Sequence, residues 1–170
     1  MNDSTDRPYK IAISFAEEDR VIASGIATAL ALYGVSYYYY PERQAEMNGK
    51  DLNESLAEVY EHKSDFALAI VSDHYVRKDF TTLEFKAIQR RLKHSKDYLI
   101  LVKVGDVVLN KLPGLNENVA YFPWRNEFRP LVEGVIKERL KLEPPVELKS
   151  NLKSLEIKNI GTIYANTVNI

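Results

Sequence analysis

The chain has 170 residues, a net charge of -1 and 45% apolar residues, which is typical of one soluble globular domain. The balanced charge argues against a nucleic-acid groove built on bulk positive charge, and the absence of cysteine excludes disulfides, thiolate nucleophiles and cysteine-based metal sites. No apolar run is long enough to span a bilayer, and the first ten residues lack a secretory signal. We therefore expect a cytoplasmic protein that binds neither membrane nor nucleic acid.

The first half of the chain predicts alternating strands and helices. Residues 9–15 alternate apolar side chains as a buried strand does, and apolar residues recur at helical spacing over 19–34. A second strand is expected at 35–40. The polar stretch 41–50 shows no periodicity and is predicted to be a loop. A helix with an acidic capping pair follows over 51–60.

The second half continues the same alternation. Its predicted elements are a strand at 66–71, a loop at 72–79, a helix at 80–92, a strand at 98–104, a short strand at 119–122 and a helix at 128–140. Such an order predicts an α/β fold with a flavodoxin-like, five-stranded, mostly parallel sheet and helices on both faces.

A short β-prone tail follows the predicted domain. Two consecutive prolines at 144–145 mark the end of the predicted domain. The sequence after Lys158 is uncharged and has apolar residues at strand-like spacing. The tail either docks as an extra edge strand on its own domain or pairs with other copies, and the proline break favours the second. We therefore divide the chain into a leader at 1–8, a domain at 9–142 and a linker with a self-assembly tail at 143–170.

Several well-known sites are excluded or weakly supported. The chain has no glycine-rich dinucleotide fingerprint, no Walker loop and no G-x-S-x-G elbow. His62, His74 and His94 lack metal-ligand spacing, so we expect no metal site. The acidic residues at 17–19 fit either a metal-binding edge, as in receiver domains, or a solvated loop and helix start. Asp73 is a poor match to a receiver phosphoacceptor.

Glu84 has two interpretations that its spacing does not separate. Thr81-x-x-Glu84 satisfies a capping box, in which Glu84 would bond the backbone amide of Thr81. Alternatively, Glu84 lies just after a strand and a loop, at the carboxyl edge of the sheet where ligands of open α/β folds bind.

Three stretches in this order resemble the bacterial form of the Toll/interleukin-1 receptor (TIR) domain, over about 9–142. ISFAEED, residues 13–19, resembles the first-strand box of that family. Residues 41–50 occupy the place of its long mobile loop. IVSDHYVRKDFTTLE, residues 70–84, resembles the S-x-x-[FY] and W-x-x-x-E segment of the third strand and the helix after it.

The resemblance implies an activity, because many bacterial TIR domains cleave the nicotinamide–ribose bond of NAD. The products are nicotinamide and ADP-ribose or a cyclic or conjugated variant, and NAD is a substrate, so no cofactor is expected. The catalytic glutamate of the family corresponds to Glu84, and Phe80 replaces the tryptophan before it. The other implied substrate-binding positions are Ser14, Phe15, Ala16, Tyr40 (where relatives often carry an Asp-Glu pair), Ser72, and Arg43 and Lys50 for the pyrophosphate.

The resemblance also implies assembly. TIR domains of this kind become active when copies stack, so we expect a homo-oligomer or filament, regulated by that assembly or by a separate sensor protein. The implied function is an NAD glycohydrolase in anti-phage defence. The alternative is a non-catalytic TIR scaffold that recruits other TIR proteins.

Overall fold

The structure is a computed structural model that describes residues 7–143, except for the side chains at positions 79–82. The predicted tail beyond Glu143 and residues 1–6 of the predicted leader lie outside the described residues. Across the described part of the chain, every helix is too short or too polar to cross a membrane.

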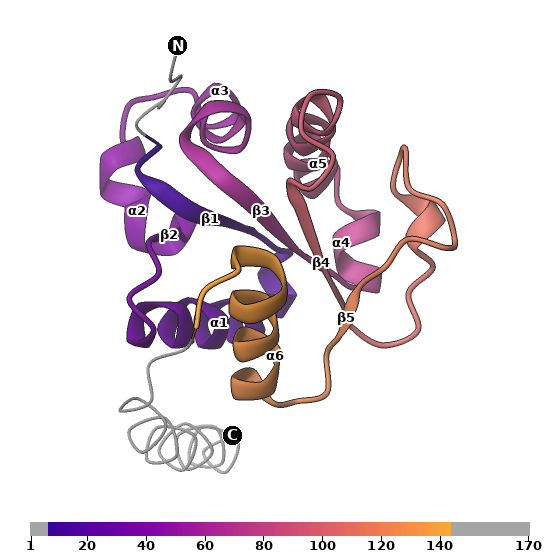
Figure 1. Cartoon of the computed structure of the whole chain (residues 1–170). Helices are drawn as coiled ribbons and strands as arrows, with labels where there is room; N and C mark the ends of the chain where they lie inside the picture. The colour runs from indigo at the N-terminus through magenta and orange to yellow at the C-terminus, as the bar shows by residue number, and fades with distance from the viewer. Residues whose placement is uncertain (1–6, 144–170) are drawn as a thin grey trace, which may run out of the picture.

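A parallel sheet of five strands forms the centre of the domain (Figure 1). The strands are β1 (Tyr9–Ser14), β2 (Tyr37–Tyr38), β3 (Ser64–Val71), β4 (Leu99–Lys103) and β5 (Phe122–Pro123). They lie in the order β2-β1-β3-β4-β5, and every neighbouring pair is parallel. This order is that of the flavodoxin-like fold and confirms the predicted fold class.

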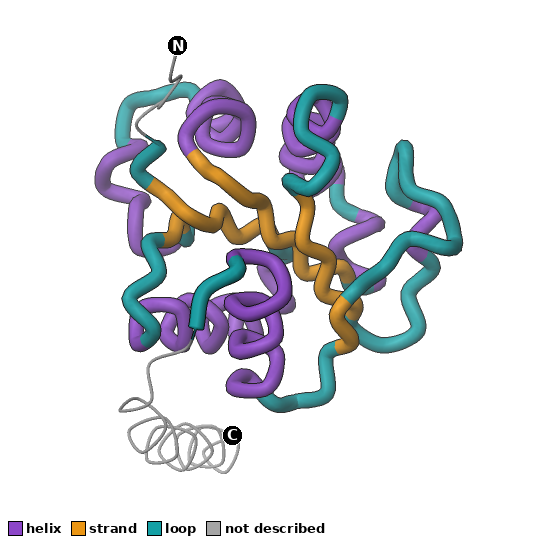
Figure 2. The backbone as a smooth tube through the Cα atoms, in the orientation of Figure 1, coloured by secondary structure: helices purple, strands orange, loops and turns teal. Residues whose placement is uncertain are grey.

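Helices cover both faces of the sheet, as the tube in Figure 2 shows. The helices are α1 (Arg20–Leu32), α2 (Tyr40–Met47), α3 (Leu52–Glu58) continued by a π-helical turn (Val59–Lys63), α4 (Asp73–Arg77), α5 (Asp79–Leu92), and α6 (Phe128–Gly134) continued by a second π-helical turn (Val135–Leu140). Helices α1 and α6 cover one face and α3 and α5 the other (Figure 1).

Two apolar clusters follow from this layering. Ile13 of β1 packs with Leu30 of α1 and Leu131 of α6 on one face. On the other face, Ala12 of β1 belongs to a cluster with residues of α3 and α5, such as Phe85. Successive residues of a strand point to opposite faces, so β1 contributes to both clusters in alternation.

The prediction of a loop over 41–50 is wrong, because Tyr40–Met47 forms the helix α2. Pro41 lies in the first turn, where its fixed φ suits a helix and its missing N–H leaves no hydrogen bond unmade. None of the residues of α2 is buried, so the helix has no apolar stripe for a sequence pattern to detect.

The second loop prediction and the bounds of two strands also need correction. The stretch 72–79 contains α4, which Ser72 caps by accepting a hydrogen bond from the Tyr75 amide at 3.2 Å. A helix of five residues with polar ends resembles a turn in sequence. The strands predicted at 35–40 and 119–122 are β2 (Tyr37–Tyr38) and β5 (Phe122–Pro123), which form the two edges of the sheet.

We expect Gly25→Ala to lower the free energy of unfolding by about 1–3 kcal/mol. A Cβ atom at this position of α1 would lie 2.1 Å from Cε1 of Phe128 in α6, so the ring or one helix would have to move. Denaturant unfolding measures the loss. Combining the change with Phe128→Leu removes the obstructing ring and should recover part of it. Equal stability of Gly25→Ala and the parent would contradict this close packing.

Candidate active site

Glu84 lies at the carboxyl edge of the sheet, beside the end of β1. It is in the second turn of α5, and only 7% of the residue is exposed. Ser14, the last residue of β1, is fully buried and donates its Oγ proton to Oε2 of Glu84. The structure therefore brings two of the predicted site residues into direct contact.

Two tyrosine hydroxyls complete the hydrogen bonding around this carboxyl group. Tyr60, from the π-helical turn after α3, shares its one hydroxyl proton between Oε2 of Glu84, at 3.3 Å, and the carbonyl of Ile13, at 3.1 Å. The hydroxyl of Tyr75, in α4, lies 2.8 Å from Oγ of Ser14. Because Ser14 gives its one proton to Glu84, it accepts from Tyr75. Three elements thus converge on one buried carboxyl group.

The capping-box interpretation of Glu84 is wrong. Helix α5 begins at Asp79, and its N-cap is Lys78, so Thr81 is inside the first turn and is not the cap. In a capping box, the glutamate bonds the backbone amide of the N-cap residue three positions before it. Glu84 lies too far along the helix from Lys78 to make this bond. The carboxyl group instead accepts hydrogen bonds from Ser14 and Tyr60.

Burial raises the pKa of Glu84 from 4.5 to about 7. Hydrogen bonds from Ser14 and Tyr60 act in the opposite direction, because they stabilise the carboxylate. The phenol groups of Tyr60 and Tyr75 have raised pKa values, first through burial and then through the charge of Glu84, so both stay protonated and donate. A carboxyl group with a pKa near neutrality is a common sign of a functional site.

The two oxygens of Glu84 differ in their described contacts. Both hydrogen bonds that it accepts from described residues go to Oε2, which leaves Oε1 without a partner among them. Glu84 also lines a cavity of about 250 Å³ between α3 and α5. The described residues of this cavity are Asn53, Glu54, Leu56, Ala57, Leu83, Glu84, Lys86 and Arg90. The space is smaller than the roughly 300–1,000 Å³ of a typical ligand pocket.

A second buried acid lies near the same edge. Ser72, which follows β3, donates its Oγ proton to Oδ2 of Asp19, and both residues are buried. Burial raises the pKa of Asp19, and the bond from Ser72 lowers it. Ser72 therefore serves Asp19 and the cap of α4, and it makes no hydrogen bond with Glu84 among the described contacts.

The other predicted residues that follow β1 and β2 divide between the two faces of the sheet. Phe15 points to the face opposite Ser14 and packs on the ring of Tyr39, with ring centroids 5.4 Å apart. Ala16 is fully buried on the Ser14 face, and Tyr40 packs half-buried against the same cluster. The structure thus places Ala16 and Tyr40, but not Phe15, on the side of Glu84.

The residues predicted to bind pyrophosphate lie in and after α2. Arg43 forms an ion pair with Glu46 at 2.9 Å, and its guanidinium carbon lies 5.8 Å from the centre of the Tyr9 ring. Lys50 is exposed. The side chain of Phe80 lies outside the described residues, so its predicted role stays a prediction.

Sequence reasoning missed the tyrosines that surround Glu84. Tyr60 belonged to an apolar helical stripe and Tyr75 to a predicted loop, and neither position signals a polar partner. Tyr38, on β2, is also fully buried, and its hydroxyl has no hydrogen-bond partner within the described structure. The charge of Glu84 contributes to raising the pKa of Tyr38, after burial and Tyr9, so the two groups share one electrostatic environment.

The described residues offer no group of three or more histidine, aspartate or glutamate side chains that could hold a metal ion. Two of the acidic residues just before α1 form ion pairs with basic side chains. Glu17 pairs with Arg20 at 2.8 Å and Glu18 with Lys78 at 2.7 Å.

Comparison with known proteins identifies relatives. The family model described as TIR domain matches residues 11–134. The chain is 29% identical over 134 residues to the 3' cyclic ADP-D-ribose synthase AaTIR of Aquimarina amphilecti, an alignment covering 78% of this chain and 40% of that protein. The chain therefore spans less than half the length of this relative.

A solved structure supports the fold. The TIR domain of the Toll-related receptor TRR-2 from Hydra magnipapillata matches with a TM-score of 0.57 and 16% sequence identity, over 79% of this chain and 99% of that one. At this identity the likeness concerns the fold alone.

The buried carboxyl group predicts that Glu84→Gln gains stability relative to the parent as pH rises. The folded parent must ionise Glu84 with a pKa of about 7 against 4.5 in its unfolded state, so it loses stability between these values. Glutamine is neutral throughout. The difference in the free energy of unfolding should grow by about 3 kcal/mol between about pH 4.5 and 7 and then level off.

Denaturant unfolding of both proteins across this pH range measures the difference. Glu58→Gln, which changes an exposed glutamate in the neighbouring helix α3, is the matched control and should show no such trend. A pH-independent difference for Glu84→Gln would contradict the raised pKa.

Proposed function

The chain belongs to the TIR domain family, and from this premise we propose that it is an NAD glycohydrolase with Glu84 as its catalytic residue. The enzyme breaks the bond between nicotinamide and ribose and releases nicotinamide together with ADP-ribose or a cyclic or conjugated ADP-ribose. NAD is consumed as a substrate, and the reaction needs no further cofactor. The similarity to a cyclic ADP-ribose synthase supports this class of activity.

The observation that carries the proposal is the state of the Glu84 carboxyl group. It is buried, Ser14 and Tyr60 hold one of its oxygens, and it lines a cavity. A carboxylate fixed in this way is preorganised, so little rearrangement is needed when charge develops beside it. Burial also weakens the screening of its charge by water.

The chemistry needs one such group. Nicotinamide leaves as a neutral base with the electrons of its bond to C1' of the ribose, so no acid has to protonate it. The ribose passes through an oxocarbenium-like transition state, and the negative charge of Glu84 stabilises the positive charge there. Attack on C1' by water gives ADP-ribose and a proton, and attack by a hydroxyl of the same molecule gives a cyclic product and a proton.

The size of the cavity supports completion of the site by a second copy. About 250 Å³ suits one part of a dinucleotide and is too small for all of it. Helix α2 and the residues after it, with Arg43 and Lys50, form an exposed segment that a neighbouring copy can receive. We propose that this segment supplies pyrophosphate contacts across a homo-oligomer or filament, in which Ser14, Ala16, Tyr40 and Phe80 line the substrate site.

The biological role that we propose is anti-phage defence in the bacterial cytoplasm, triggered by assembly or by a separate sensor protein. The predicted self-assembly tail lies outside the described residues. The second candidate function is a non-catalytic TIR scaffold. Its supporting observation is that Glu84 bonds internally to Ser14 and Tyr60, as a structural buried acid also would.

We expect Glu84→Gln to abolish NAD cleavage while the protein stays folded. Glutamine can keep the hydrogen bonds from Ser14 and Tyr60 but lacks the negative charge that stabilises the transition state. NAD loss and product masses are measured on concentrated protein and on protein clustered by a multivalent tag, with Glu58→Gln as control. Full activity of folded Glu84→Gln would overturn the assignment, and no NAD loss by the clustered parent would favour the scaffold.

The raised pKa of Glu84 predicts an acid limb in the pH profile of kcat/KM. The reaction requires the ionised carboxylate, so the rate should fall as pH drops below about 7. Tyr60→Phe removes a hydrogen bond that lowers this pKa, and the limb should then move to higher pH. Tyr33→Phe removes a hydroxyl that bonds Glu133 of α6 and should leave the limb in place. A limb that does not move in Tyr60→Phe would contradict the role of that hydroxyl.

A further inference from the structure

A basic cleft lies at the amino edge of the sheet, at the end opposite Glu84. Arg7 precedes β1, Glu61 and His62 precede β3, and Arg90 and Arg91 close α5, so these segments meet where the strands begin. They surround a cavity of about 670 Å³. Its described lining residues are Arg7, Glu61, His62, Arg90, Arg91, Lys93, His94 and Ser95.

The charges of this cleft are not balanced. Three arginines and one lysine line it, whereas Glu61 is the one carboxylate among its described lining residues. The whole chain, by contrast, has a net charge of -1. The Glu61 carboxylate is occupied by Arg90, whose Nε donates to it at 2.6 Å. Arg91 donates to the backbone carbonyl of Glu61 at 2.7 Å, and this neutral acceptor does not compensate its charge.

Arg7 is also incompletely paired. Its Nη1 lies 3.5 Å from Oδ1 of Asp65, and the other oxygen of Asp65 accepts from Lys10 at 3.0 Å. The buried Nε of Arg7 has no hydrogen-bond partner among the residues that the structure describes. Buried donors are nearly always satisfied, so this nitrogen indicates a site for an acceptor.

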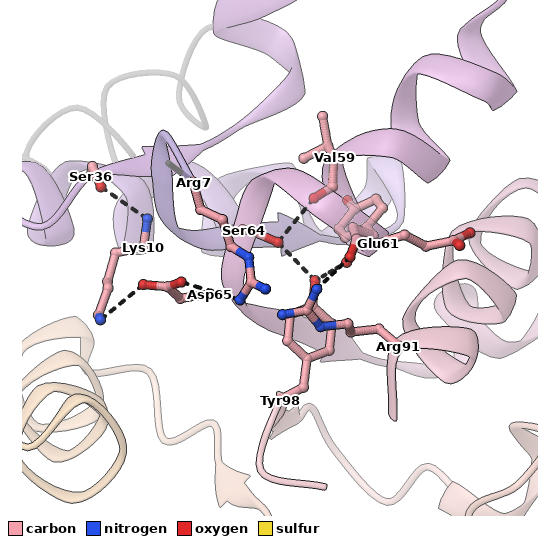
Figure 3. Close-up of polar contacts among 10 residues, drawn as sticks. Arg7, Lys10, Ser36, Val59, Glu61, Ser64, Asp65, Arg91 and Tyr98 are labelled. Atoms are coloured by element: carbon pink, nitrogen blue, oxygen red, sulfur yellow. Dashed lines mark hydrogen bonds and ion pairs between the residues drawn. The ribbon is translucent and has the colours of Figure 1, made fainter. Parts of the chain in front are cut away.

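The two guanidinium groups act on one another. Figure 3 shows Arg7 and Arg91 approaching the region beside Ser64 from different elements. Burial lowers the pKa of Arg91, and the charge of Arg7 lowers it further. Arg91 is also held over the ring of buried Tyr98, at 5.4 Å from the ring centre, which fixes its position. An anion between these groups would relieve the repulsion.

We propose that this cleft binds a phosphate-bearing ligand of nucleotide size, held through its diphosphate by Arg7, Arg91 and Lys93. Guanidinium forks match phosphate oxygens in charge and geometry, and Arg7 and Arg91 both line the cavity. The volume lies within the range of small-molecule sites and is larger than a single inorganic ion requires. The proposal is independent of NAD cleavage, since the cleft does not include Glu84.

Titration calorimetry with pyrophosphate and with ADP-ribose tests the proposal on the full chain carrying Glu84→Gln. Both probes should bind at a site that Lys93→Glu weakens by about tenfold or more. Lys96→Glu is the matched control, because Lys96 is exposed, close in sequence and not among the lining residues, and it should bind as the parent does. Arg91→Gln should also weaken binding, with thermal unfolding as a check on folding.

The probes distinguish the source of the phosphate. Equal affinities would indicate recognition of the diphosphate alone, whereas tighter binding of ADP-ribose would indicate that the cleft also contacts the nucleoside. Unchanged affinity in folded Lys93→Glu, or no binding of either probe to the parent at about 1 mM, would overturn the proposal. Affinity for single-stranded RNA that rises with its length and far exceeds that for pyrophosphate would overturn it in favour of a nucleic-acid surface.

Discussion

The burial of one carboxyl group is the constraint on which the carboxyl edge of the sheet depends. Removing a carboxylate from water is costly unless donors replace the solvent, and here Ser14 and Tyr60 supply them. Ser14 in turn needs the hydroxyl of Tyr75, so β1, α4, α5 and the π-helical turn after α3 are tied to the same few atoms. Fold and proposed chemistry therefore share one set of hydrogen bonds at this edge.

The fold follows largely from patterns that the sequence carries openly. Strands β1, β3 and β4 are buried apolar runs, and α1 and α5 bury one apolar stripe each, so periodicity is enough to predict them. Periodicity does not predict helix α2, because none of its residues is buried. It does not predict α4 either, because that helix is too short to show a period. Pro41 in the first turn favours α2, and the cap from Ser72 favours α4, and neither feature leaves a periodic signal.

The contact at the centre of the candidate site was easier to predict than its surroundings. Its place after a strand and a loop made Glu84 a candidate, the family resemblance placed Ser14 in the same site, and their contact depends on how α5 packs on β1. The role of Tyr60 could not be predicted, since a tyrosine in an apolar stripe looks like core until its hydroxyl partner is known. The side of Phe15 was predictable, because neighbours in a strand alternate and Ser14 takes the opposite face.

Helix α5 limits how the chain can vary in length. Glu84 and Arg91 lie about two turns apart on this helix, so they share nearly the same side of it while serving opposite ends of the sheet. Insertion or deletion of one residue between them would rotate one relative to the other by about 100° and shift it by about 1.5 Å. Related chains that keep both side chains should therefore preserve the length of this segment even where its sequence diverges.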